Sequence, residues 1–137
     1  MLLLTFIFTG CATKKEDGHA GGHAENHGPD EEQVWQEMDD FHLIMAETFH
    51  PYKDSSNLDP VKRRAAELMS SADKWASSPL PEKVDNAEVR SKLVKLKTEA
   101  TTLAEQVRSA DDNVIGEQLT RLHDTFHELQ EAWYGGN

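Results

Sequence analysis

The segment from Ile115 to Trp133, IGEQLTRLHDTFHELQEAW, decides the fold class of this 137-residue chain. Large apolar side chains recur in it at steps of four and three residues, which places them on one face of an α-helix. These residues are Ile115, Leu119, Leu122, Phe126, Leu129 and Trp133. The segment therefore predicts an amphipathic helix that buries its apolar stripe against other helices.

Three earlier segments repeat this spacing. Their stripes are Val34, Met38, Phe41, Met45, Thr48 and Tyr52, then Val61, Ala65, Leu68, Ala72 and Trp75, then Val89, Leu93, Leu96, Ala100, Leu103 and Val107. Segments this short are not stable alone, but four of them can bury one another's stripes. Short connections join antiparallel neighbours, so residues 31–137 are predicted to form an all-α, antiparallel, up-down-up-down four-helix bundle.

Helix boundaries follow from capping and breaking residues. Asp59 with Pro60 predicts an N-cap and first position for the second helix, and Asp85 with Glu88 predicts a capping box for the third. Proline also predicts the loop over residues 51–57, between the first and second helices.

The first eleven residues predict an export signal. Residues 1–10, MLLLTFIFTG, form an apolar run too short to span a bilayer as a helix, and the single cysteine of the chain follows at once. Phe8-Thr9-Gly10-Cys11 resembles the lipobox of bacterial lipoproteins. The resemblance implies cleavage before Cys11, lipidation of that cysteine, and a membrane-anchored protein of the cell envelope that faces the periplasm or the exterior. An apolar start with an ordinary buried cysteine is the alternative.

Residues 11–30 predict a disordered tether, because they lack large apolar side chains after the cysteine. His19, His23 and His27 lie four residues apart in this tether, a His-rich tract of the kind that captures divalent metal ions. The alternative is a solvated spacer between the anchor and the bundle.

The charge of the chain restricts its partners. The chain has 25 acidic and 14 basic residues and a formal net charge of −11, which favours cations and argues against nucleic acid. No nucleophile paired with a base, phosphate-binding loop or inward carboxylate pair is evident in the sequence, so an enzyme is not predicted.

A short motif occurs twice, as ETFH at residues 47–50 and DTFH at residues 124–127. An acid three residues before a histidine is typical of carboxylate-bridged di-iron bundles. At about 100° per residue, however, Glu47 and Asp124 fall about 160° to 180° from their apolar stripes, in solvent, while both phenylalanines fall near the core. A di-iron site is therefore not predicted.

Three histidines predict a metal site. His123 and His127 lie four residues apart, one above the other on a helix face, where two imidazoles can bind one metal ion. His42 lies on the matching flank of the first helix and at the matching height, whereas His50 points away from the core. The alternative is that His123 and His127 are ordinary surface residues.

The remaining ligands and the metal stay open. Water, Asp39, Glu131, or a thioether from Met38 or Met45 could complete the site. Thioether with imidazole favours copper(I), whereas imidazole with oxygen favours zinc or nickel. Core methionines are otherwise packing residues.

The helix lengths and loops from residue 31 onward resemble the periplasmic four-helix cytochromes of the b and c-prime type. The c-prime pattern attaches haem through Cys-x-x-Cys-His near the C-terminus, and no cysteine occurs there. The b-type resemblance implies non-covalent haem held by Met38 or Met45 together with His127.

The leading hypothesis is a lipid-anchored envelope protein that binds copper, zinc or nickel through His42, His123 and His127, for metal handling or sensing. The alternatives are a haem b electron-transfer protein and a metal-free interaction module. In the last of these, a protein partner would bind the outer face, where Leu43 is predicted to be exposed.

Overall fold

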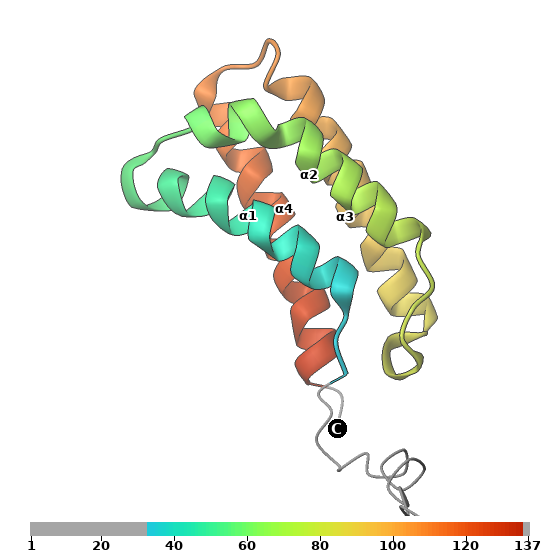
Figure 1. Ribbon diagram of the computed structural model, residues 1–137. Coiled ribbons are helices and arrows are strands. Elements are labelled where there is room, and N and C mark those ends of the chain that lie inside the picture. Colours follow the sequence, from blue (N-terminus) through green and yellow to red (C-terminus); the bar gives the residue numbers. More distant parts are fainter. Residues whose placement is uncertain (1–32, 136–137) are drawn as a thin grey trace, which may run out of the picture. The chain divides into compact units, whose positions relative to one another are not determined.

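The computed structural model describes residues 33–135, which form a four-helix bundle with one short 3₁₀ helix (Figure 1). The elements are α1 (Gln36–Ser55), α2 (Asp59–Ser77), the 3₁₀ helix η1 (Glu82–Val84), α3 (Ala87–Gln106) and α4 (Asp112–Tyr134). Each α-helix packs against the next in chain order, and α1 also packs against α4. No β-strand occurs among the described residues. The predicted all-α four-helix bundle is confirmed.

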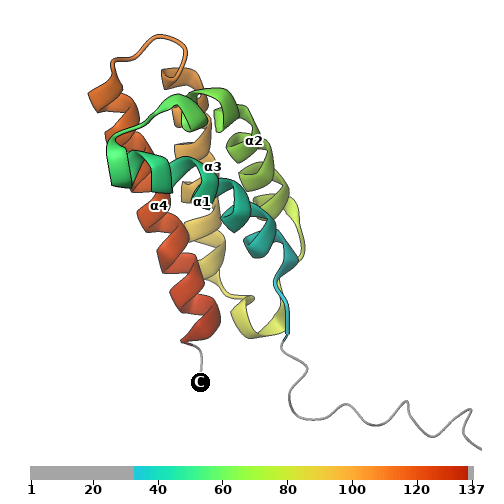
Figure 2. The same ribbon diagram turned by 60° about the vertical axis from the view of Figure 1, so that its left-hand side comes forward.

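Contacts at the two ends of the bundle show how the helices run. The Trp35 ring, just before α1, lies 5.1 Å from that of Trp75 near the end of α2 and 5.5 Å from that of Trp133 near the end of α4. At the opposite end, Lys62 Nζ near the start of α2 lies 2.6 Å from Asp112 Oδ1 at the start of α4. Two views show the chain reversing direction from helix to helix (Figures 1 and 2).

The four apolar stripes meet in one core. Every stripe residue predicted for α2 and α4 is buried, as are Met38, Phe41 and Met45 of α1. The α3 stripe is buried as far as Leu103, and Val107 is only partly buried. Burying these side chains removes about 25 cal/mol of free energy per Å² of apolar surface, which makes the stripes the main source of stability.

The prediction for Val34 is wrong. Its side chain is 62% exposed, whereas that of Trp35 is 1% exposed and contacts the core in its place. The reason is that α1 begins only at Gln36, so Val34 lies before the helix and the helical spacing does not apply to it.

The predicted loop over residues 51–57 is also wrong in its first part, because α1 continues through Pro51 to Ser55. Ser56 ends the helix in the left-handed conformation, at φ 55° and ψ 26°. Its N–H donates to the Tyr52 carbonyl at 2.7 Å, and the next N–H donates to the Pro51 carbonyl at 3.1 Å. These bonds satisfy the last turn, so one proline does not stop the helix.

Two predicted helix starts are displaced by one residue. Leu58 precedes α2 without a side-chain cap, and Asp59 is already helical. At α3 the N-cap is Asn86, whose side chain accepts a hydrogen bond from the Val89 N–H at 2.9 Å, whereas the predicted cap was Asp85. Asparagine in extended backbone is as good an N-cap as aspartate, so Asn86 caps the helix one residue after the predicted position.

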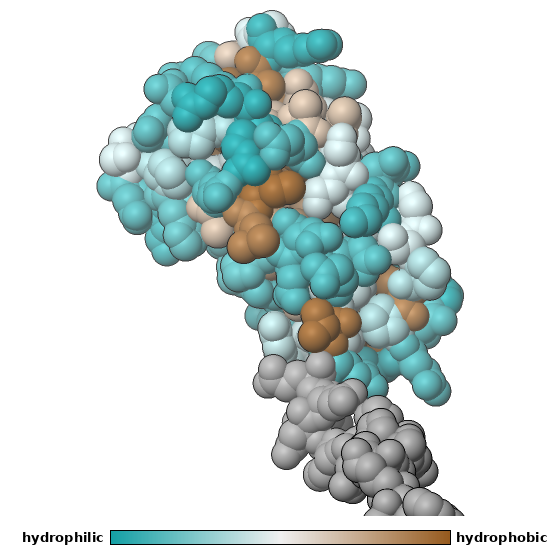
Figure 3. All heavy atoms as spheres, in the orientation of Figure 1, coloured by the Kyte–Doolittle hydropathy of each residue, from teal (hydrophilic) through white to brown (hydrophobic). Residues whose placement is uncertain are grey.

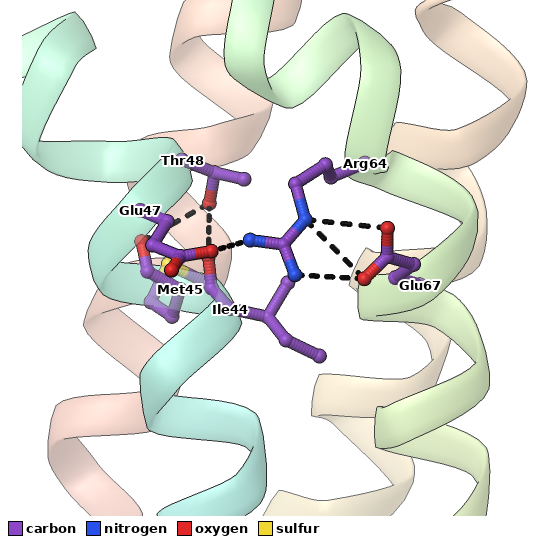
Figure 4. Close-up of polar contacts among 6 residues, drawn as sticks. All are labelled: Ile44, Met45, Glu47, Thr48, Arg64 and Glu67. Carbon is purple, nitrogen blue, oxygen red and sulfur yellow. Dashed lines mark hydrogen bonds and ion pairs between the residues drawn. The ribbon is translucent and has the colours of Figure 1, made fainter.

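The first copy of the repeated motif lies at the contact between α1 and α2 (Figure 4). Glu47 is exposed, as predicted, and pairs with Arg64 of α2, which also pairs with Glu67 at 2.8 Å. Thr48 is fully buried, and its hydroxyl donates to two carbonyls of the preceding turn, each at 3.0 Å. The acid of this motif therefore belongs to a surface ion-pair network and lies outside the core.

The surface is mainly hydrophilic, with a few apolar patches (Figure 3). The exposed large apolar side chains are Val34, Leu43, Val94, Val114 and Tyr134. The predicted exposure of Leu43 is confirmed, at 69%. Within residues 33–135, none of the helices combines the length and the apolar character needed to cross a bilayer.

Candidate metal centre

Two imidazole rings meet on the flank of α4 that faces α1. His123 and His127 are one helical turn apart, and their Nε2 atoms are separated by 3.0 Å. The ring centroids are 4.3 Å apart and the ring planes make an angle of 77°, so the rings meet at these nitrogens rather than face to face. The helical spacing predicts this proximity, and the structure has it.

The separation of 3.0 Å suits two states of the pair. Two neutral rings share one hydrogen bond at this distance, with one Nε2–H as donor and the other Nε2 as acceptor. Two imidazoles bound to one tetrahedral zinc ion, with Zn–N bonds of about 2.0–2.1 Å, have nitrogens about 3.3 Å apart. Metal binding would therefore move the nitrogens apart by a few tenths of an ångström and turn the rings so that both Nε2 lone pairs point at the ion.

The ring of Phe49 on α1 packs against the ring of His123. The two rings are stacked, with centroids 3.6 Å apart and an angle of 10° between their planes. Phe49 is 8% exposed and the His123 side chain 21% exposed, so the imidazole is pressed onto the edge of the core. The stack limits rotation of the ring and keeps Nε2 on the side of His127.

Burial lowers the pKa of His123, because the charged imidazolium loses hydration there, and the neighbouring His127 lowers it further. Asp124 acts in the opposite direction, with its Oδ1 3.7 Å from the His123 Nδ1. Lys53 of α1 adds a small lowering effect. The net lowering keeps His123 neutral to a lower pH than an ordinary histidine, and the neutral ring is the form that binds metal.

His42 lies beside the pair but is not part of it. Its ring stacks on Phe126 of α4, with centroids 5.2 Å apart, and the His127 ring lies 5.7 Å from the same phenylalanine. Among the described residues, no three or more His, Cys, Asp or Glu side chains are close enough to hold one ion together. The structure thus brings His123 and His127 together. His42 instead contacts Phe126, which also contacts His127.

The other predicted ligands occupy different surroundings. Met38 and Met45 are each 1% exposed and pack in the hydrophobic core. Glu131 lines a hollow between α3 and α4 that also includes Lys92. Asp39 is half-buried, and His50 is exposed on α1, as predicted.

Four of the predicted functional residues fall in the N-terminal segment. Cys11, His19, His23 and His27 lie outside the described residues, so lipidation and metal capture by the tether stay predictions. The haem prediction required Met38 or Met45 with His127. Both methionines are buried, whereas His127 is exposed and its ring packs against Phe126, which in turn packs against Phe41 at 5.6 Å.

The sequence did not assign a role to Phe49, although it placed the side chain near the core. The available signal was its position in the repeated motif, since an aromatic residue on the inner flank of α1 can reach the facing flank of α4. The Asp124 side chain is 70% exposed, as its helical phase predicted. It contributes only through its position beside the Nδ1 of His123.

A second partly buried ionisable group, Glu99 of α3, lies against the opposite side of α4. The Glu99 Oε2 atom of α3 is buried without a hydrogen-bond partner, as is the hydroxyl of Thr125, which is fully buried on α4. Gln118 donates to the Glu99 carbonyl at 3.1 Å. Burial raises the pKa of the Glu99 carboxyl, and the nearby Thr125 and Lys95 partly oppose this.

No protein-family model, curated protein or solved structure matches this chain. The resemblances to lipoproteins and to four-helix cytochromes therefore depend only on the residues named above.

Proposed function

We propose that this protein binds a divalent transition metal ion through the Nε2 atoms of His123 and His127. The observation that carries the proposal is the 3.0 Å separation of these nitrogens on one exposed flank of α4. Two imidazoles at i and i+4 whose Nε2 atoms already lie close together can share an ion after a small separation and a turn of the rings.

The local chemistry favours imidazole nitrogen with oxygen ligands. Because Asp124 lies beside Nδ1 of His123, it favours the tautomer that carries a proton on Nδ1 and leaves Nε2 free for the metal. The thioethers of Met38 and Met45 are buried in the core, which weakens the case for copper(I). Zinc(II), copper(II) and nickel(II) all suit nitrogen with oxygen, and zinc is the simplest probe because it has no redox chemistry.

The wider role rests on the N-terminal sequence. A lipidated Cys11 would hold the bundle at a membrane of the cell envelope, and His19, His23 and His27 would raise the local concentration of metal near it. In this proposal the tether collects ions and the α4 pair holds one in a defined geometry, for metal handling or sensing. His42 is a candidate third ligand if its ring leaves Phe126.

Isothermal titration with zinc tests the α4 pair. The full chain would carry His19→Gln, His23→Gln and His27→Gln, so that binding by the tether does not mask the site. The double variant His123→Ala, His127→Ala in this background is expected to lose high-affinity binding, because no ligand pair remains on α4. Circular dichroism should show that the helices persist, since both side chains lie outside the apolar stripe.

His50→Ala in the same background is the matched control. His50 is also an exposed helical histidine, but it is not part of the pair, so its loss should leave zinc affinity unchanged. Equal affinity of the double variant and its parent would refute the proposal. His42→Ala measures the contribution of the neighbouring ring separately.

A further inference from the structure

The α4 pair is an incomplete coordination site. It supplies two nitrogens, and no third His, Cys, Asp or Glu side chain among the described residues is close enough to share an ion with it. Protein-bound zinc takes three or four protein ligands. An ion held by two imidazoles alone would have two positions filled by water, and these positions remain available to another donor.

We propose that a second copy of this chain supplies the missing ligands, so that one metal ion joins two bundles through His123 and His127 of each. This inference rests on the proposed function, because it needs the pair to bind metal. The resulting four-imidazole site is closed and tetrahedral, the geometry that zinc adopts in structural sites.

The geometry of the pair suits a two-fold axis. A helical i, i+4 pair spans one edge of a tetrahedron, and a two-fold axis through the ion generates the opposite edge from an identical pair. Such an interface uses the same patch on both copies. His127 is exposed and the His123 ring is 21% exposed, so the converging nitrogens lie at the surface rather than within the core.

The surface beside the pair has an apolar component that the monomer leaves uncovered. His42 is exposed on the α1 side of the pair, and the next residue, Leu43, is 69% exposed. The partly buried Ile44 that follows points toward Arg64 of α2 (Figure 4), so of these two apolar residues only Leu43 is available to a second copy. A second copy centred on the metal would approach α1 from the side of His42 and cover Leu43 in part.

The charge of the chain makes the association dependent on metal. Each copy has a formal net charge of −11, so two copies repel each other in the absence of a cation. One exposed leucine side chain is too small to hold a dimer by itself, because stable interfaces bury about 800 Å² on each partner. The metal-free protein should therefore be monomeric, and the ion should contribute both charge neutralisation and coordination.

Sedimentation velocity combined with metal analysis tests the dimer. The full chain with His19→Gln, His23→Gln and His27→Gln would be titrated with zinc at several protein concentrations. The expected result is a doubling of mass that ends at one zinc per two chains and is reversed by a chelator. In the same background, His127→Ala should abolish the dimer, while His50→Ala should leave it intact.

Leu43→Glu provides an independent check on the interface. It places like charges in the contact without touching a ligand, so the dimer should require a higher protein concentration while the α4 pair still binds zinc. Binding of one zinc per chain without any change of mass would overturn the dimer and leave the proposed function standing. Absence of zinc binding would overturn both. An unchanged dimer in the Leu43→Glu variant would contradict the placement of the interface.

Discussion

Partial burial shifts the pKa of an ionisable group in opposite directions on the two sides of α4. On the side that faces α1, partial burial lowers the pKa of His123. On the side that faces α3, partial burial raises the pKa of Glu99. The cause is the same, since loss of hydration disfavours the charged form, but the charged form of a histidine carries the proton and that of a glutamate lacks it.

This difference distinguishes the proposed metal site from the contact between α3 and α4. The lowered pKa of His123 favours its neutral ring, which is the form that binds a metal ion, and its Nε2 lies 3.0 Å from that of His127. The carboxyl of Glu99 is partly buried, and the hydroxyl of the fully buried Thr125 lowers its pKa without offsetting the effect of burial. Burial of the Glu99 carboxylate therefore costs free energy near neutral pH, because its charged form loses hydration.

The largest expected effect comes from removing the Phe126 ring, which contacts two histidines on the side of α4 that faces α1. Phe126 contacts His42 and His127 as well as the core aromatic rings of Phe41 and Trp75. Phe126→Ala should therefore lower the free energy of unfolding by about 3–5 kcal/mol, as is usual for a buried phenylalanine. Urea denaturation of the metal-free protein measures the loss.

Leu96→Ala on α3 is the control for this substitution. Leu96 is fully buried and should cost about 2–5 kcal/mol, but it is not one of the rings that contact the histidines. Under conditions where both variants remain folded, only Phe126→Ala should weaken zinc binding. An equal loss of affinity in both variants would mean that the pair depends on global stability rather than on local support.

The bundle was predictable because its stripes are long and regular. The stripes of α2 and α4 were predicted without error, since twenty or so residues of consistent spacing leave little ambiguity. The errors lie at helix ends, where Val34, Pro51 and Asp85 each depend on one or two local interactions. Which of two adjacent capping residues is used, or whether a helix continues through one proline, is decided by hydrogen bonds that periodicity does not report.

The candidate site was predictable in part. Spacing alone gave the contact between His123 and His127, and matching heights placed His42 opposite the second half of α4, where it contacts Phe126. The stack of Phe49 on His123 was not predicted, because it depends on how far two flanks of different helices approach each other. The partial burial of Glu99 has the same explanation, because it depends on how closely α3 and α4 pack.

The next largest effect is a pH dependence of the free energy of unfolding that comes from His123, on the side of α4 that faces α1. The folded pKa of His123 is lowered, so its contribution to stability is complete above the unfolded value of about 6.5 and is lost as the pH falls through the folded value. In the presence of a chelator, wild type should lose less than about 1 kcal/mol by this route between about pH 7.5 and about pH 5.5, because solvent screens the group. His123→Gln should show a shallower slope in this window, measured by urea denaturation at each pH. His50→Gln should retain the wild-type slope, and identical slopes in all three proteins would exclude His123 as the source.

A smaller effect of opposite sign is expected from the α3 side. The folded pKa of Glu99 is raised, so its contribution to stability is present below the unfolded value of about 4.3 and is lost as the pH rises through the folded value. Near neutral pH the protein therefore carries an unfavourable carboxylate, and Glu99→Gln should stabilise it by less than about 1 kcal/mol. Glu88→Gln is a control on the exposed surface of α3, where pairing with Lys92 lowers the pKa instead, so this change should not stabilise the protein. Loss of stability in Glu99→Gln at neutral pH would show that the carboxylate has a favourable partner.

The smallest expected quantity is the coupling between the two sides. His123 lies on the side of α4 that faces α1, whereas Glu99 of α3 packs against the opposite side of α4, and no hydrogen bond or ring contact joins them. The double variant His123→Gln, Glu99→Gln should therefore change stability by the sum of the single changes within about 0.3–0.5 kcal/mol. The measurement is a double-mutant cycle in urea near pH 7. A larger coupling would mean that α4 moves as a unit when either flank changes. Zinc binding by His123 and His127 would then alter the packing between α3 and α4 and change the pKa of Glu99.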